Sequence, residues 1–357
     1  MTNFFNLEFN EITKETEDSV SISIKIPEQL KETFSYVSGQ YITLKHNVNN
    51  QEVIRSYSLC SSPFETDFRI GVKKIENGLM STYLNEDLKV DGSLEVMAPE
   101  GNFSIHPNKK AKKNYVGVAA GSGITPILSM LKSVLLEETR STFTLYYVNK
   151  TEKTSMFKNE IEDYLNRYPK NLKVVNLYTQ QNQENPLFNG RITKEKFENL
   201  MKDNKKIQKS DGVFICGPED MIFDVSTALT DAGCNKDIIN YELFGTPVDK
   251  MKQDAPQVET DFEGESQVTV IMDGDEFEFP LRNDGNFILD ASIENGADAP
   301  FSCKGAVCCT CKAQVIEGKA IMDMNYALSD EEVEEGFILT CQARPASAKL
   351  VVDYDVS

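Results

Sequence analysis

The chain has 357 residues, 40% of them hydrophobic and 26% charged, and its formal net charge is −19. This composition is that of a globular protein, and the length predicts two or three domains. The acidic balance disfavours nucleic acid and anionic membrane surfaces as partners. No run approaches the roughly 18 apolar residues of a membrane span, and residues 1–20 lack the pattern of a signal peptide. We therefore expect a cytoplasmic protein, in which thiols stay reduced.

The first part of the chain, residues 1–107, has the pattern of an antiparallel β-barrel. Short runs of alternating apolar and polar residues are separated by Gly, Pro and Asn. The clearest runs are residues 20–26, 41–44, 69–73 and 93–97. Period-two alternation between turn-forming residues predicts strands with one buried face, in a barrel or a sandwich, and we expect the barrel.

Residues 108–245 follow a different pattern, in which apolar strands alternate with helices. The expected strands are residues 115–120, 143–148, 173–178 and 213–217. The expected helices begin near Thr125, Met156, Thr193 and Glu219. This alternation predicts an α/β domain built on a parallel sheet.

The end of the chain has the pattern of a linker followed by a small α+β domain. Residues 246–265 are polar and without periodicity, as linkers are. In residues 266–357 we expect a hairpin at Asp273-Gly274, a helix over 287–296 and a closing strand over 349–355. This domain has six Lys or Arg against 17 Asp or Glu, a balance of −11. The excess either keeps the domain soluble or forms a docking face for a basic partner.

Four of the eight cysteines fall within residues 303–311. The spacing Cys303-x4-Cys308-x2-Cys311, followed after 29 residues by Cys341, is that of plant-type [2Fe–2S] ligation. Zinc sites usually pair two short hairpins, so zinc is the less favoured alternative. In this register Cys309 is not a ligand, and we expect it to pack beside the cluster.

This cysteine-bearing domain resembles plant-type ferredoxins, which implies a β-grasp fold. A one-electron carrier needs a donor, and residues 55–58 resemble the flavin motif of the ferredoxin–NADP reductase superfamily. The resemblance implies an FAD site that includes Arg55, Ser56, Tyr57 and Ser58. The Arg55 charge suits a pyrophosphate, the Tyr57 ring suits a flavin face, and the Ser58 hydroxyl suits a hydrogen bond near flavin N5.

Two further segments match this superfamily. Residues 77–84, NGLMSTYL, resemble the helix start that binds the flavin diphosphate, where free N–H groups attract an anion. The implied contacts come from Gly78, Met80, Ser81 and Thr82. Ser81 is equally interpreted as an ordinary helix cap. Residues 98–103, APEGNF, match the turn that closes the barrel.

Two motifs predict a nicotinamide nucleotide site. Residues 119–126, AAGSGITP, lie after a strand and open a helix, so their backbone suits a pyrophosphate. Residues 215–221 resemble the superfamily's Cys-Gly-Pro motif, whose cysteine lies near the nicotinamide, although Cys216 is equally interpreted as a core residue. The implied contact residues are Gly121, Gly123, Thr125, Pro126, Cys216, Gly217 and Pro218.

The nucleotide is expected to be NADPH, with NADH as the alternative. Asn149 and Lys150 follow the strand at 143–148, and no carboxylate is available there to bind a ribose 2′-hydroxyl. Lys150 suits a 2′-phosphate, and the family resemblance suggests that Arg191 adds positive charge to the same pocket.

The three domains in this order resemble the reductase components of multicomponent oxygenases, and most closely the reductase subunits of phenylacetyl-CoA epoxidases. Residues 155–164, 303–311, 324–328 and 339–345 carry the closer match. The resemblance implies that hydride passes from NAD(P)H to FAD, with Tyr57, Ser58 and Cys216 as the catalytic residues around the reacting rings. The cluster then carries single electrons to a partner.

The partner is expected to be a separate oxygenase, with phenylacetyl-CoA epoxidase favoured. The chain has only two histidines, His46 and His106, neither in a Glu-x-x-His setting, so di-iron, Rieske and haem sites lack ligands. Two alternatives remain open. One is a general NAD(P)H-dependent reductase that serves several carriers, and the other is a non-catalytic module whose tail is held by zinc.

Overall fold

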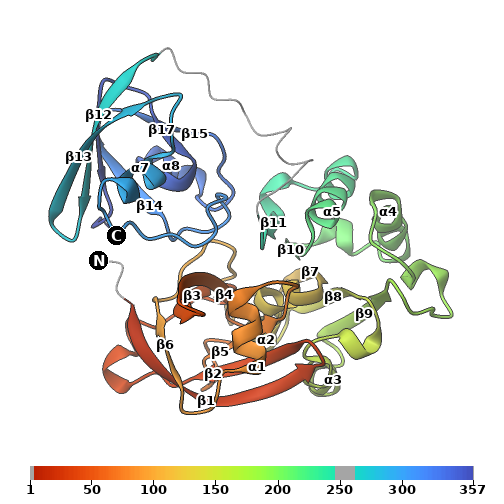
Figure 1. Ribbon diagram of the computed structural model, residues 1–357. Coiled ribbons are helices and arrows are strands. Elements are labelled where there is room, and N and C mark those ends of the chain that lie inside the picture. The colour runs from red at the N-terminus through yellow and green to blue at the C-terminus, as the bar shows by residue number, and fades with distance from the viewer. Residues whose placement is uncertain (1–3, 246–261, 357) are drawn as a thin grey trace. The chain divides into compact units, whose positions relative to one another are not determined.

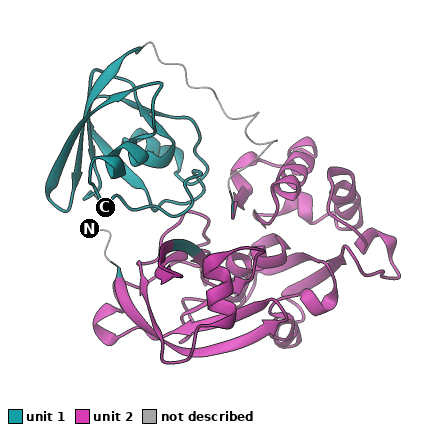
Figure 2. Ribbon diagram, viewed as in Figure 1, with its two compact units in different colours: residues 1–4, 54–56, 245–357 teal, residues 5–53, 57–244 magenta. Residues whose placement is uncertain are grey.

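The computed structural model describes residues 4–245 and 262–356 (Figure 1). The predicted linker, residues 246–265, falls outside these residues as far as residue 261. The chain divides into two compact units (Figure 2), one of residues 5–53 and 57–244 and the other of residues 1–4, 54–56 and 245–357. Among the described residues, no helix has the length and apolar character needed to cross a membrane.

The first unit begins with an antiparallel sheet that closes on itself. Its strand order is β4-β3-β6-β1-β2-β5, and a bridge from Leu59, just after β4, to Ile70 of β5 joins the two ends. The strands are β1 (Phe5–Thr16), β2 (Ser19–Ile24), β3 (Tyr41–Val48), β4 (Gln51–Ser58), β5 (Arg69–Lys73) and β6 (Ser93–Val96). Helix α1 (Leu79–Glu86) and a short 3-10 helix (Glu28–Leu30) accompany them. The predicted antiparallel barrel is confirmed, and β1 is a strand that the sequence pattern did not single out.

The same unit continues with a parallel sheet of order β11-β10-β7-β8-β9. Its strands are β7 (Asn114–Ala120), β8 (Thr142–Asn149), β9 (Leu172–Tyr178), β10 (Gly212–Cys216) and β11 (Ile239–Glu242). The crossover helices are α2 (Ile124–Glu137), α3 (Lys158–Arg167), α4 (Lys194–Asp203) and α5 (Glu219–Asp231). Short 3-10 helices cover Gly121–Gly123, Glu152–Thr154, Pro186–Phe188, Ile207–Lys209 and Lys236–Ile238. The predicted α/β organisation is confirmed, and β11 is an additional strand.

Helix α2 carries a charged side chain into the interior of this unit. Lys132 is 1% exposed, and its ammonium lies 2.9 Å from Glu65 Oε2 and 2.5 Å from Glu160 Oε1. Arg69 of β5 donates to both oxygens of the Glu160 carboxylate at 2.7 Å. Although burial opposes it, the Lys132 charge holds the pKa of the Glu65 carboxyl below its ordinary value. The barrel and the parallel sheet are therefore joined by a buried ion network formed by Lys132, Glu65, Glu160 and Arg69.

The second unit is a β-grasp domain. Its main sheet has the order β13-β12-β18-β14-β16, in which β12 and β18 are parallel and the other pairs are antiparallel. The strands are β12 (Glu265–Met272), β13 (Asp275–Arg282), β14 (Lys312–Glu317), β16 (Phe337–Leu339) and β18 (Lys349–Asp353), with β15 (Ala320–Met322) and β17 (Ala343–Pro345) as a separate pair. The helices are α7 (Ile288–Glu294), α8 (Asp330–Glu334) and the 3-10 helix η7 (Thr340–Gln342).

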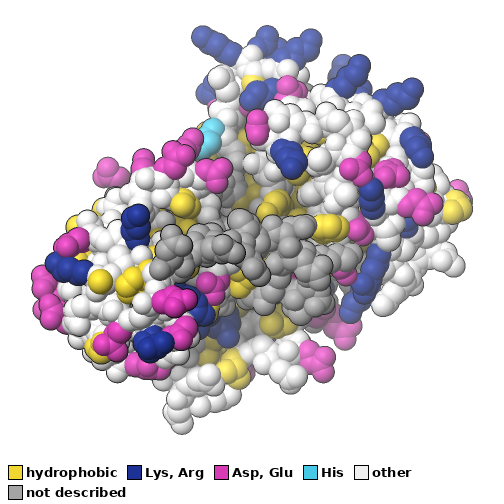
Figure 3. All heavy atoms as spheres, turned by 90° about the horizontal axis from the view of Figure 1, so that it is seen from above, with side chains coloured by type: hydrophobic (Ala, Val, Ile, Leu, Met, Phe, Trp, Pro, Cys, Tyr) yellow, Lys and Arg dark blue, Asp and Glu magenta, His cyan; other side chains and the backbone are white. Residues whose placement is uncertain are grey.

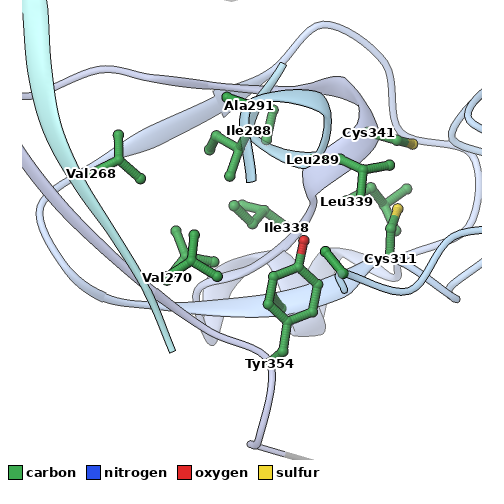
Figure 4. Packing of buried hydrophobic residues seen from close by; sticks show 14 of the residues in the cluster. Val268, Val270, Ile288, Leu289, Ala291, Cys311, Ile338, Leu339, Cys341 and Tyr354 are labelled. Atoms are coloured by element: carbon green, nitrogen blue, oxygen red, sulfur yellow. The ribbon is translucent and has the colours of Figure 1, made fainter. Parts of the chain in front are cut away.

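The local predictions for this domain are also confirmed. The turn between β12 and β13 has φ of 53° at Asp273 and 80° at Gly274, as a two-residue type I′ hairpin requires. The predicted helix and closing strand correspond to α7 and β18. Residues of α7 pack on the sheet, where Ile288 and Val268 are fully buried in one apolar core (Figure 4).

Candidate functional site

The cysteine loop lies between α7 and β14, and the structure brings its thiols together with a distant one. Cys308 Sγ lies 3.1 Å from Cys303 Sγ. Cys341, in η7, is hydrogen-bonded to the thiols of both Cys303 and Cys311. Cys308, Cys311 and Cys341 are all buried. The spacing in the sequence therefore corresponds to a single group of four sulfurs.

The backbone of this loop is shaped to approach the sulfurs. The Gly305 N–H donates to Cys303 Sγ at 3.3 Å, and the Ala306 N–H donates to Cys341. Lys304 and Ala306 have φ of 51° and 60°, in the left-handed region that residues other than glycine rarely adopt. Backbone strain of this kind costs about 1–3 kcal/mol for each residue and gathers at functional sites.

The donor set fits an iron–sulfur cluster better than a zinc ion. A [2Fe–2S] cluster is larger than one ion, because four thiolates share two irons. The four thiols are hydrogen-bonded in a row, from Cys308 to Cys303, on to Cys341, and finally to Cys311. Their spacing is that of plant-type [2Fe–2S] ligation and not that of the paired hairpins of zinc sites.

The extra thiol of the loop, Cys309, points elsewhere. It is 7% exposed, and its sulfur donates to the Ala327 carbonyl at 3.7 Å. Cys309 belongs to the apolar core of the domain. This position agrees with a packing role, and its exclusion from the ligand set stays a prediction.

The flavin-motif residues lie on β4 and differ in exposure. The Arg55 side chain is exposed and donates to the Ile54 carbonyl at 2.6 Å. Ser56 and Tyr57 are half-buried, and Ser58 is 4% exposed. The Ser58 hydroxyl donates to Glu242 Oε2 at 3.4 Å. The last residue of β4 therefore meets the last residue of β11.

Glu242 is a candidate site residue that the sequence analysis missed. It is the register partner of Cys216 in the parallel sheet. Burial raises the pKa of the Glu242 carboxyl to about 8, although the Ser58 hydrogen bond opposes the shift. Burial, followed by the Glu242 charge, raises the pKa of the Cys216 thiol well above its ordinary value. The only indication in the sequence was that Glu242 is a carboxylate at the end of a short apolar stretch. No recognisable motif surrounds it.

The start of α1 lines an open hollow of about 620 Å³. Its lining includes Gly78 and Thr82, and also Asn47, Asn49 and Tyr83, which the sequence analysis did not name. A side chain at Gly78 would collide with Ile75 and Ser81.

Met80 and Ser81, the other two residues predicted to contact FAD from this segment, face inward and do not line the hollow. The Ser81 hydroxyl accepts from the Ile75 N–H at 3.2 Å and donates to the Gly78 carbonyl at 3.3 Å. Met80 is 1% exposed and packs in the barrel core. The Ser81 hydroxyl therefore bonds the turn that leads into α1, while the N-cap is Gly78 and no side chain caps the helix. A contact of Ser81 or Met80 with FAD stays a prediction.

The glycine loop before α2 packs directly against the Cys-Gly-Pro segment. A Cβ at Gly123 would lie 2.2 Å from the Cys216 carbonyl oxygen, so only glycine fits. Gly121 has a φ of 55° and open space around it. Thr125 is buried, and its hydroxyl donates to the Ser122 carbonyl at 2.9 Å. Pro126 is buried in α2, while Gly217 and Pro218 lead from β10 into α5.

The two predicted 2′-phosphate residues lie at the same edge of the parallel sheet. Lys150 directly follows β8, whose last residue pairs with Tyr178 at the end of β9. The Gly190 N–H donates to the Tyr178 carbonyl at 2.7 Å, which brings the neighbouring Arg191 to that edge. Both side chains are exposed, and neither pairs with a carboxylate among the described residues.

The closed barrel, the parallel sheet with its glycine loop and the four-thiol β-grasp domain together define an NAD(P)H-dependent flavin and iron–sulfur oxidoreductase. Comparison with known families gives the same three parts. Residues 6–105 match the oxidoreductase FAD-binding domain, residues 118–227 match the oxidoreductase NAD-binding domain, and residues 270–346 match the 2Fe-2S iron-sulfur cluster binding domain.

The relatives share this order of domains over the whole chain. The chain is 38% identical to a subunit of the 1,2-phenylacetyl-CoA epoxidase from Escherichia coli K12, over 99% of both chains. It is 30% identical to the ferredoxin reductase component of 3-ketosteroid-9-alpha-monooxygenase from Rhodococcus rhodochrous, over 96% of this chain and 95% of that protein. Phthalate dioxygenase reductase has a similar structure, with a TM-score of 0.59 and 25% identity over 98% of both chains. The chain belongs to this family of three-domain reductases.

Proposed function

We propose that the chain passes electrons from NAD(P)H through FAD and a [2Fe–2S] cluster to a separate oxygenase, a phenylacetyl-CoA epoxidase. The identity of 38% to the epoxidase protein from Escherichia coli, over 99% of both chains, carries this proposal. The group of four thiols, the hollow at α1 and the glycine loop before α2 support three cofactor sites in one chain.

The residues proposed for the flavin divide into contacts and supports. Gly78 and Thr82 line the hollow at α1, where N–H groups of the helix start suit the FAD diphosphate. Arg55, whose exposed charge suits a pyrophosphate, and Ser56 are proposed as FAD contacts on the sequence motif alone. Met80 and Ser81 hold the helix start in place from behind. Tyr57 is proposed as the aromatic wall of the flavin ring.

Hydride transfer requires the two rings to stack, and the chain supplies the walls and the proton control. FAD, when bound, accepts a hydride and releases electrons singly. The buried Cys216 backs the nicotinamide side, while Gly121 and Gly123 leave room for the nucleotide diphosphate. Below about pH 8 the Glu242 carboxyl holds a proton. At 3.4 Å from the Ser58 hydroxyl, it can exchange that proton with the flavin side.

NADPH is the proposed nucleotide. Lys150 and Arg191 lie at one edge of the parallel sheet with their charges exposed. Two cations at the carboxyl ends of β8 and β9 favour a 2′-phosphate over a 2′-hydroxyl. NADH has no 2′-phosphate and would lack this attraction. The preference for NADPH over NADH should therefore appear as a lower KM for NADPH.

The acceptor is proposed to dock on the acidic β-grasp domain, which has the charge for a basic partner. Asp330, Glu331 and Glu334 of α8 are exposed, and Glu335 follows them. On the face drawn in Figure 3, however, acidic side chains are interspersed with basic ones. Such a surface suits steering of a partner rather than tight charge pairing.

A second candidate acceptor comes from the other relatives. Reductase components of 3-ketosteroid-9-alpha-monooxygenases share 29% to 30% identity with this chain over nearly its full length. The same architecture therefore serves more than one oxygenase. The second candidate function of this chain is therefore that of a general reductase that delivers electrons to several carriers.

The experiment is a reconstitution with the oxygenase subunits of a phenylacetyl-CoA epoxidase. We expect the purified chain to show flavin and [2Fe–2S] absorbance that NADPH bleaches without oxygen, and to support epoxide formation when oxygen and the oxygenase are added. Equal electron delivery to a 3-ketosteroid monooxygenase would contradict a dedicated partner. A colourless protein that contains zinc would contradict the whole relay.

A further inference from the structure

The residue that follows the last strand, Tyr354, is held in a fixed position inside the β-grasp core. Its side chain is 7% exposed, and its hydroxyl points toward the side of Leu339 and Cys311 in Figure 4. Its N–H donates to the Ile271 carbonyl at 3.0 Å. The next residue, Asp355, fastens the tail further, because its carboxylate accepts the N–H groups of the β12–β13 turn at 2.8 and 2.9 Å.

A chain of buried hydrogen bonds leads from this tyrosine to the cysteine loop. The Tyr354 hydroxyl donates to Thr340 Oγ1 at 2.7 Å, and the Thr340 hydroxyl donates to the Cys311 carbonyl at 3.0 Å. A carbonyl can only accept, so the threonine proton must point to Cys311 and the tyrosine proton must point to the threonine. The Thr340 N–H also donates to the Cys311 carbonyl, at 3.2 Å.

These hydrogen bonds connect the two parts of the sequence that supply the thiols. Cys311 ends the cysteine loop, while Thr340 directly precedes Cys341 in η7. Thr340 is fully buried, so no solvent replaces these bonds. We propose that Tyr354 is a positioning residue that, through the Thr340 hydroxyl, fixes the Cys311 and Cys341 segments and raises the reduction potential of the cluster they hold. This inference rests on the proposed ligation by these cysteines.

The direction of the effect follows from the orientation of the two hydroxyls. The O–H bonds of Tyr354 and Thr340 both point toward Cys311. The positive ends of these bonds therefore face the proposed cluster. Reduction adds one negative charge to a [2Fe–2S] cluster, so dipoles whose positive ends face the cluster favour its reduced form, as hydrogen bonds to its sulfurs do. Hydrogen bonds in a chain also polarise one another. A tyrosine hydroxyl ordinarily titrates near pH 10, so at neutral pH it keeps its proton and remains a donor.

The experiment is a redox titration of the full-length protein with the Tyr354→Phe variant, which removes only the hydroxyl. We expect the one-electron reduction equilibrium of the cluster to shift two- to fivefold toward the oxidised form, within the 59 mV that a tenfold change represents. The cluster is followed by its electron paramagnetic resonance signal, and the flavin potential of the same sample serves as an internal reference. An unchanged cluster potential would overturn the inference.

Two variants of Thr340 test whether the effect passes through this residue. Thr340→Val should shift the potential in the same direction, and adding Tyr354→Phe to it should cause no further change. Thr340→Ser keeps the hydroxyl and should retain the wild-type value. Additive shifts would mean that Tyr354 acts by another route, which would overturn the proposed chain.

Asp355→Asn is the matched control for a loosened tail, since it weakens the anchoring of the turn and keeps the tyrosine hydroxyl. We expect a lower melting temperature with an unchanged cluster potential. If Asp355→Asn shifts the potential as much as Tyr354→Phe does, general loosening replaces the hydroxyl as the cause and the inference fails. A wild-type protein without any iron–sulfur signal would instead refute the proposed ligation, so the two failures are distinguishable.

Discussion

The two redox regions of this protein are assembled in opposite ways. In the β-grasp domain, three of the four candidate ligands fall within nine residues, on a loop whose backbone itself donates to the sulfurs. At the hydride-transfer site, Ser58 and Glu242 are 184 positions apart and meet only because a barrel strand and a parallel strand end at the same place. Spacing in the sequence therefore defines the first site, whereas strand register defines the second.

The difference also shows in what holds each region together. The cysteine loop lies on an apolar core, and its strain is compensated by packing. The barrel and the parallel sheet are joined instead by the buried ion network of Lys132, Glu65, Glu160 and Arg69. A single substitution of a ligand in the cysteine loop should abolish cluster binding. A single substitution in the unit held together by strand register and the ion network should instead cause a partial loss of stability or activity.

The largest effect is expected in the cysteine loop. Cys308→Ser should abolish the [2Fe–2S] absorbance and electron transfer beyond the flavin, because these clusters are held by thiolates and a hydroxyl, which is far less acidic than a thiol, is a poor substitute. Cys309→Ser should leave both intact, since the Cys309 sulfur contacts a carbonyl in the core. Visible spectroscopy and iron analysis check the pair. The reverse result would move the ligand register by one residue.

A smaller, graded effect is expected in the ion network of the other unit. Lys132→Met should lower the free energy of unfolding by about 3 kcal/mol, because the partly buried Glu65 carboxylate loses its ion pair and Glu160 keeps only its pair with Arg69. The melting temperature, measured by calorimetry with FAD present, should fall by roughly 10 °C. Lys158→Met is the control, since its ion pairs are exposed and should contribute under about 1 kcal/mol. Equal changes in the two variants would show that the buried network adds no stability.

The sequence predicted the parts of the molecule that depend on local pattern. Strand alternation, the Asp273-Gly274 turn and the cysteine spacing each need only a short window of residues. The ion network and the Ser58–Glu242 contact could not be predicted without the tertiary fold. The residues near Lys132 or Glu242 in the sequence give no indication of which side chains these two contact. Ser81 illustrates the limit within a motif, since its hydroxyl bonds its own turn.

The third expected effect is a pH dependence caused by Glu242. Its pKa is about 8 in the folded protein against an ordinary value of 4.5, so between these values the folded state binds a proton that the unfolded state has lost. The free energy of unfolding should therefore fall as the pH rises from about 5 to 8, with a slope of at most about 1.4 kcal/mol per pH unit. Because Glu242 is partly exposed, solvent should reduce the total change in the free energy of unfolding to about 2 kcal/mol.

Glu242→Gln isolates this contribution. The amide keeps the size of the side chain and cannot titrate, so the difference in stability between the two proteins should change across this pH range and level off above it. Chemical denaturation at several pH values provides the measurement. A difference that stays constant from pH 5 to 8 would show that the carboxyl is ionised throughout, and would remove Glu242 as a proton carrier.

The smallest effect concerns Lys150, at the edge of the parallel sheet. Lys150→Ala should raise the KM for NADPH by up to about tenfold, which is the loss of one charge-assisted contact to a phosphate. The KM for NADH should change little, because a 2′-hydroxyl gains little from the ammonium. Steady-state kinetics with both nucleotides and a soluble electron acceptor measure the ratio. Lys170→Ala is a suitable control, since Lys170 is also exposed but lies just before β9, at the opposite end of the strands. If Lys150→Ala raises both KM values equally, the lysine contributes general attraction, and selectivity for the 2′-phosphate must rest on Arg191.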